Sequence, residues 1–183
     1  MLLIVADDAV SQLSHMAELG DSPGPRKPRD TRRIGYLYAG RTHSPNIVDW
    51  AKKQPTIQAV AVVGSHARGT ARAESDIDLV LLVTNPRAFR ADVAWLDAID
   101  WNAIGSRPMK WRNEDYGELW SRRLWLEQNG GEVEFGFASP SWADVNPLDP
   151  GTRRVIADGC RILHDPKKIL SRLCAAIGGP RQP

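Results

Sequence analysis

The sequence is short of cysteine, of long apolar runs and of excess charge, and each shortage excludes a class of protein. Two cysteines among 183 residues, Cys160 and Cys174, are too few for a disulfide framework or a cysteine-based metal cluster. No apolar run approaches the roughly 20 residues that span a bilayer, and residues 1–6 are too short an apolar start for a signal-peptide core. The formal net charge is only +2, so the chain as a whole is not typical of nucleic-acid binders. We therefore expect a cytoplasmic protein without a membrane segment or a nucleic-acid partner.

The remaining composition is typical of one soluble globular domain. Hydrophobic residues make up 42% of the chain and charged residues 25%, which is enough for a single core but leaves no room for a second domain of ordinary size. Residues 1–33 differ, because proline, glycine and charge dominate from Asp21 to Arg33. Such a composition buries too little apolar surface to offset chain entropy. We expect a flexible segment over 1–33, or an extension from a misassigned start codon, and one folded domain over 34–183.

Apolar patterns and cap residues predict an alternation of helices and strands that is not regular. β-Branched runs and a glycine-containing hairpin turn predict strands over 57–63, 75–83, 119–127, 132–138 and 160–163. Cap residues followed by proline or an apolar period predict helices over 45–54, 86–99, 150–157 and 167–177. A turn opening a short helix is expected over 65–74, and 101–116 is expected to be mostly loop. Because these elements lack the regular βαβ order, we expect an α+β fold.

Two aspartates at the start of a buried strand carry the clearest chemical signal. Asp76 and Asp78 lie two residues apart, so their side chains project from the same face of the strand. Adjacent carboxylates repel each other unless a positive group lies between them. Hard oxygen ligands of this kind suit magnesium, which binds through one or two carboxylates together with substrate phosphates.

A glycine and a serine follow the preceding strand and suggest a phosphate site. Gly64 permits close approach of the backbone, and Ser65 offers a hydroxyl and an amide at a predicted helix start. Arg68 and Arg72 are near enough in sequence to add positive charge, and Ser75 directly precedes the aspartates. We therefore expect Gly64, Ser65, Arg68 and Ser75 to bind a nucleotide.

A third acid is expected on the strand over 132–138. Alternation places Val133, Phe135 and Phe137 on one face and Glu134 on the other. Glu132 shares the face of Glu134 but lies next to the turn, where an exposed acid is ordinary. We therefore prefer Glu134 as the third ligand of a two-metal site.

Together these residues resemble the signature of the polymerase-β-like nucleotidyltransferase superfamily. Gly64-Ser65, ten intervening residues and Asp76-x-Asp78 match its motif, and the apolar-Glu134-apolar pattern matches the place of its third acid. The resemblance extends over about residues 45–140 and is strongest over 62–83.

The resemblance implies both a fold and a reaction. The fold is a palm with a mixed β-sheet and helices packed on one face. Asp76, Asp78 and Glu134 are the implied catalytic residues and the ligands of two Mg²⁺ ions, and Ser65 with nearby amides would hold the β- and γ-phosphates. With ATP as donor, an acceptor hydroxyl activated by Glu134 would attack the α-phosphate and release pyrophosphate.

The acceptor stays open at this point. Antibiotic nucleotidyltransferases of the aminoglycoside and lincosamide type modify a small molecule and usually rely on an added helical domain or a dimer to bind it, whereas this chain offers only a short C-terminal helix. Minimal nucleotidyltransferase antitoxins adenylylate a partner toxin, and a nucleotide-binding module without turnover is a further alternative. Trp120 and Trp125 fall on opposite faces of their predicted strand, so at least one of them is placed to line the acceptor side. His66 is interpreted as structural or solvent-facing rather than catalytic.

Overall fold

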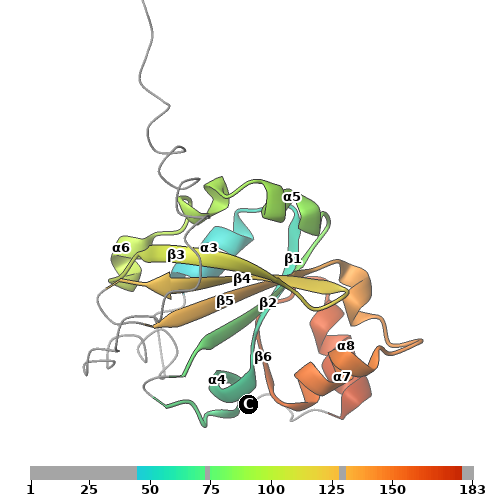
Figure 1. The fold of residues 1–183 in the computed structure, drawn as a ribbon. Coiled ribbons are helices and arrows are strands. Elements are labelled where there is room, and N and C mark those ends of the chain that lie inside the picture. The colour runs from blue at the N-terminus through green and yellow to red at the C-terminus, as the bar shows by residue number, and fades with distance from the viewer. Residues whose placement is uncertain (1–44, 73–74, 128–130, 179–183) are drawn as a thin grey trace, which may run out of the picture.

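A mixed six-stranded sheet forms the centre of the computed structural model, which describes residues 45–72, 75–127 and 131–178. The strand order is β3-β4-β5-β2-β1-β6 (Figure 1). The strands are β1 Ile57–Val63, β2 Ile77–Val83, β3 Pro108–Asp115, β4 Leu119–Leu126, β5 Glu132–Ala138 and β6 Cys160–His164. β2 and β5 pair in parallel, and the other neighbours pair antiparallel. The α+β class and the mixed sheet are thus confirmed.

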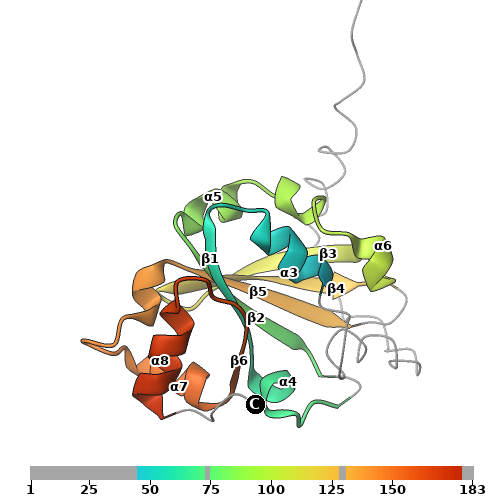
Figure 2. The same ribbon diagram turned by 180° about the vertical axis from the view of Figure 1, so that it is seen from behind.

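Helices lie on both faces of this sheet, which corrects the expectation that they pack on one face (Figures 1 and 2). The helices are α3 Pro45–Lys52, α4 Gly64–Arg68, α5 Pro86–Ala91, α6 Trp101–Ile104, α7 Pro150–Ala157 and α8 Ile169–Ile177, with 3₁₀ turns η2 Ala94–Leu96 and η3 Pro140–Ala143. The physical reason is that β1 and β2 are buried along nearly their whole length. Strands that are apolar on both faces require cover on both.

Two hydrophobic cores result, one on each face. The α3-side core includes Ile47, Trp50, Val62, Leu79, Trp95, Phe135 and Phe137. The α8-side core includes Ala61, Val80, Leu82, Trp142, Ile156, Leu170 and Leu173. Asp78 and Glu134 alternate with residues of the α3-side core, so they project from the other face, the face that α7 and α8 cover in part.

The segment before β4 departs most from the sequence-based expectation. Residues 86–99 form α5 and then η2 rather than one helix, because Asp92 ends α5 in an extended conformation and its Oδ1 accepts the amide of Ala94 at 2.8 Å. The expected loop over 101–116 contains α6 and β3. α6 begins at a side-chain cap from Asp100 and ends at Gly105, whose φ is 79°.

A fully buried arginine, Arg122, forms hydrogen bonds that link the α5 segment to the sheet. The guanidinium of Arg122 donates to the carbonyl oxygens of Phe89 at 3.3 Å and Arg90 at 3.0 Å. It also donates to Asn113 Oδ1 at 3.0 Å, and its carbon lies 4.4 Å from the centroid of the Trp111 ring. Burial and the nearby Arg90 lower the pKa of Arg122 to about 10. Arg122 thus holds the α5 segment against β3 and β4.

The expected N-terminal segment 1–33, the cap at Ser44 and most of the hairpin turn at 129–131 lie outside the described residues. Among the helices that the structure describes, none is long and apolar enough to cross a bilayer.

Candidate active site

Asp78 and Glu134 lie side by side in the lining of a large cleft. They are direct partners in the parallel register of β2 and β5, so their side chains emerge from neighbouring strands on the same face. The cleft has a volume of about 1070 Å³ and is lined by Gly64, Asp78 and Glu134. Its walls are the turn over 116–119, Trp142 and the inward side of α7 from Asp149 to Asp158. The sequence-predicted pairing of an aspartate on one strand with a glutamate on another is therefore present in space.

Gly64 allows the carboxylate of Asp78 to approach the turn after β1. Its φ is 67°, in the region that favours glycine, and a Cβ at this position would lie 3.1 Å from Asp78 Oδ2. The Gly64 amide donates to the carbonyl oxygen of Gly159 at 3.2 Å, which ties the turn to the corner between α7 and β6. The sequence predicts that another group approaches the backbone closely at Gly64. In the structure that group is the carboxylate of Asp78, the residue that pairs with Glu134.

The environment of Asp78 disfavours its negative charge. Burial is the largest cause, the carboxylates of Glu134 and Asp76 add to it, and Arg123 opposes them, so that the pKa of Asp78 rises to about 6. Oxygen ligands that repel one another in this way form a donor set that suits a hard divalent cation. As the side chains stand, however, no three histidine, cysteine, aspartate or glutamate side chains within the described ranges are grouped to hold a metal ion.

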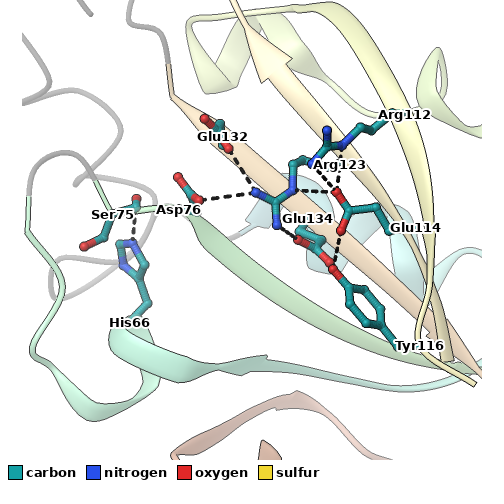
Figure 3. A network of polar contacts seen from close by, with 9 residues as sticks. All are labelled: His66, Ser75, Asp76, Arg112, Glu114, Tyr116, Arg123, Glu132 and Glu134. Atoms are coloured by element: carbon teal, nitrogen blue, oxygen red, sulfur yellow. Dashed lines mark hydrogen bonds and ion pairs between the residues drawn. The ribbon is translucent and has the colours of Figure 1, made fainter. Parts of the chain in front are cut away.

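Arg123 lies at the centre of an acidic cluster on this face (Figure 3). Its Nη2 donates to Glu134 Oε2 at 2.6 Å, and its Nη1 lies 3.3 Å from Glu132 Oε2 and 3.8 Å from Asp76 Oδ2. Its Nε lies 3.6 Å from Glu114 Oε1. Burial alone would lower the pKa of Arg123, but the carboxylates of Glu134 and Glu114 outweigh it and raise the pKa above its usual range. One guanidinium thus joins carboxylates from β3, β5 and the segment before β2.

Tyr116 and Arg112 extend the cluster to the edge strand β3. The Tyr116 hydroxyl donates to Glu114 Oε2, and Arg112 Nε donates to Glu114 Oε1 at 2.7 Å. The bond from Tyr116, together with the two arginines, lowers the pKa of Glu114 against the effect of burial. The same bond, together with burial and Glu134, raises the pKa of Tyr116 to about 12. Tyr116 lines the cleft although the residue is 55% exposed, and its hydroxyl is held by Glu114.

The other predicted site residues that the structure describes do not line the cleft; these are Ser65, Arg68, Ser75 and Asp76. Arg68 forms an ion pair with Asp158, which does line the cleft. Ser75 Oγ accepts the amide of Arg72 at 2.9 Å, and the Ser75 carbonyl oxygen lies 3.4 Å from His66 Nε2. Ser65 is the second residue of α4, and its carbonyl oxygen accepts the amide of Thr70 at 3.0 Å.

Sequence reasoning missed Arg123, Glu114 and Tyr116. A signal existed for Arg123, because residues equidistant from a hairpin turn face each other, and the register of β4 and β5 pairs Arg123 with Glu134. No comparable signal existed for Glu114 and Tyr116, because β3 was not predicted. The two tryptophans of β4 lie on opposite faces as expected. Trp120 belongs to the α3-side core, and Trp125 lies beneath Lys110, whose Nζ is 4.7 Å from the ring centroid.

Comparison with known proteins agrees with this geometry. The sequence profile of the nucleotidyltransferase domain matches residues 46–160, which contain Gly64, both aspartates and Glu134. A comparison with curated protein sequences finds no significant match. The profile covers more than half of the chain, spans strands β1 to β5 and ends at the first residue of β6. The chain therefore belongs to the nucleotidyltransferase domain family, within the polymerase-β-like nucleotidyltransferase superfamily.

Proposed function

We propose that this protein transfers a nucleoside monophosphate, AMP from ATP, to an acceptor hydroxyl with release of pyrophosphate. The observation that carries the proposal is the pairing of Asp78 with Glu134 in the lining of the cleft, beside the Gly64 turn. Membership of the family supports nucleotidyl transfer in general. The identity of the nucleotide and of the acceptor is our inference.

Asp76, Asp78 and Glu134 would hold divalent cations, for which Mg²⁺ is the natural choice. Their oxygen atoms suit a hard cation, and the raised pKa of Asp78 reflects the need of this group for a positive partner. Bound ions of this kind neutralise charge on the attacking and departing oxygens of a phosphoryl transfer.

The residues of the chain itself have separate tasks in this proposal. The amides that follow Gly64 would bind phosphate oxygens of the triphosphate, because they lie at the start of α4 beside Asp78. Glu134 would accept the proton of the acceptor hydroxyl, since it lines the cleft and belongs to the same face as Asp78. The α7 wall and the turn at Tyr116 would exclude water from part of the donor nucleotide.

The cleft supports a small cationic acceptor such as an aminoglycoside. Its volume of about 1070 Å³ lies at the upper end of the range of small-molecule sites. Beyond Asp78 and Glu134, its lining includes Glu118, Asp149 and Asp158 against Arg154. An acidic lining attracts amino groups by simple electrostatics and repels an anionic acceptor. A hydroxyl on such a molecule would meet Glu134 in the lining of the cleft.

Calorimetric titration with each of the four ribonucleoside triphosphates, with and without Mg²⁺, tests the donor site. We expect metal-dependent binding of ATP that is lost in the double variant Asp76→Asn/Asp78→Asn. The matched control is Asp97→Asn/Asp144→Asn, which removes the same charge from exposed positions outside the cleft lining. Binding that survives in the active-site double variant, or no binding of any triphosphate to the unaltered protein, contradicts the proposal.

Transfer itself is measured with ATP labelled at the α-phosphate. We expect label to move to an aminoglycoside from a panel of amino sugars, and the Glu134→Gln variant to lose the transfer while it retains nucleotide binding. Label that moves only to a partner protein would instead support the antitoxin-like alternative and reject the small-molecule acceptor.

A further inference from the structure

We propose that Arg123 is an internal counter-ion, which holds Glu134 and Asp76 in the metal-free protein and must release them when a divalent cation binds. This inference rests on the proposed function, because it concerns the same metal ligands. Arg123 would act through Glu134 and Asp76, so it is a positioning residue that governs when the site accepts metal.

The contacts of Arg123 place one cation between two proposed metal ligands from different parts of the chain. Nη2 binds Glu134 at 2.6 Å, and Nη1 lies 3.8 Å from Asp76. The side chain of Arg123 is 24% exposed and that of Glu134 only 14%, so water screens this ion pair less than it would screen a surface pair. In this arrangement the two carboxylates are directed toward a guanidinium (Figure 3).

A divalent cation bound to the same carboxylates would compete with the guanidinium. Both are cations that need the same oxygen atoms, and two cations within a few ångströms of each other repel strongly in a partly buried site. If the two oxygens of Glu134 were shared between Arg123 and the metal ion, the guanidinium and the metal ion would lie close together as like charges. Metal binding therefore favours release of Glu134 and Asp76 by Arg123. The contacts of Arg123 therefore lower the affinity of the metal-free protein for a free divalent cation.

Two further carboxylates, those of Glu132 and Glu114, can pair with the Arg123 guanidinium after it leaves the metal ligands. Glu132 Oε2 lies 3.3 Å from Nη1, and Glu114 Oε1 lies 3.6 Å from Nε. Neither belongs to the proposed metal ligands, and Glu114 is itself fixed by Tyr116 and Arg112. A short movement of the guanidinium toward this pair would free Glu134 and Asp76 without leaving the charge of Arg123 unpaired. A triphosphate brings its own negative charge, so uptake of the metal together with the nucleotide is favoured over uptake of the free ion.

Manganese titration of the nucleotide-free protein, followed by electron paramagnetic resonance, tests the inference. We expect Arg123→Gln to bind Mn²⁺ about threefold or more tightly than the unaltered protein, because the competing charge is removed. Arg123→Lys keeps the charge and is expected to stay near the unaltered protein. The matched control is Arg154→Gln, which removes a positive charge from the α7 wall of the same cleft and is expected to change the affinity by less than about twofold.

The outcomes separate this inference from the proposed function. Equal or weaker Mn²⁺ binding by Arg123→Gln, or an equal gain in Arg154→Gln, overturns the role of Arg123 and leaves the metal site intact. If the unaltered protein and all variants fail to bind Mn²⁺, with and without ATP, the metal site falls and the role of Arg123 falls with it.

A second measurement uses the unaltered protein and needs no folded variant at this position. The Nε–H resonance of Arg123 is assigned by sequential experiments on the unaltered protein and is followed by nuclear magnetic resonance while Mg²⁺ and ATP are added. We expect it to move from one position to another as the metal–nucleotide complex binds. A resonance that keeps its position at saturation shows that the guanidinium does not move, which overturns the inference.

Discussion

Asp78 is held where its own negative charge opposes folding. Its pKa rises from 3.8 to about 6 in the folded protein, so between these pH values the folded state binds more protons than the unfolded chain. Stability therefore falls as the pH rises through this window. Because Asp78 is in part open to the cleft, the penalty above pH 6 is smaller than the full shift implies.

Asp78→Asn is accordingly expected to stabilise the metal-free protein at pH 8. Asparagine resembles the protonated aspartate, so the gain in unfolding free energy is about 1–2 kcal/mol at pH 8 and falls to a small part of this near pH 4, close to the unfolded pKa of 3.8. Urea denaturation of both proteins in EDTA at the two pH values measures it. The same gain at both values would show that charge is not the cause. The variant gains stability and loses function, as is common at sites built for charge.

The turn at Gly64 serves both the backbone and the site, and a second glycine separates these effects. Gly64 and Gly69 both have positive φ, 67° and 73°, but a Cβ at Gly69 meets nothing within 4 Å. We expect Gly64→Ala and Gly69→Ala each to lower the unfolding free energy by about 1–2 kcal/mol through backbone strain. Only Gly64→Ala should also weaken Mg²⁺–ATP binding, because its methyl group contacts the Asp78 carboxylate. Calorimetry on both variants decides this, and equal losses of binding would contradict it.

Among the elements, the edge strand β3 lacks an apolar period and is contacted by two arginines of β4. Its sequence places charged residues on both faces, and its pairing with β4 is supported by Arg122 from the α3 side and by Arg123 from the cleft side. Two arginines of β4 thus contact the edge strand that carries Glu114 from opposite faces.

Arg122→Met tests the first of these contacts. It leaves the carbonyl oxygens of Phe89 and Arg90 without the guanidinium that binds them, and we expect a loss of about 3 kcal/mol in the free energy of unfolding. Arg87→Met, at an exposed position of α5, should change it by less than about 0.5 kcal/mol. Urea denaturation compares the two variants, provided that the dependence of the unfolding free energy on urea concentration is the same for both. A loss of unfolding free energy below about 1 kcal/mol in Arg122→Met would show that the buried charge does not stabilise β3.

The same elements show how far the sequence could predict the structure. β1 is a largely β-branched apolar run followed by Gly64, β2 is an apolar run that begins at the paired aspartates, and the caps at Asn85 and Asp149 are the ones expected. Asp78 and Glu134 followed from alternation alone, but their register as neighbours depends on the order of the strands. β3 could not be predicted, because its charged residues leave no apolar period. The position of Arg123 depends on β3 as well as on β5, so the cluster around it became visible only in the folded chain.

At the scale of the whole molecule, one sheet is shared by two cores, and the cleft depends on both. On the strands that carry Asp78 and Glu134, the residues that flank these acids pack in the α3-side core. The α7 wall of the cleft packs in the α8-side core through Ile156. Because the two cores share β1, β2 and β5, loss of packing in either is expected to unfold the entire chain in one transition.

Leu173→Ala tests this coupling from the face of the sheet on which Asp78 and Glu134 project. Leu173 is fully buried in the α8-side core, so truncation should lower the unfolding free energy by about 2–4 kcal/mol. Most buried tryptophans lie in the opposite core, among them Trp50, Trp95 and Trp101. Their fluorescence should nevertheless change at the same lowered urea concentration as the circular dichroism signal. If the tryptophans report an unchanged midpoint while circular dichroism shows an earlier loss of helix, the α8-side core unfolds alone. Nucleotide binding would then be lost before the sheet that carries Asp78 and Glu134 unfolds, because α7 forms one wall of the cleft.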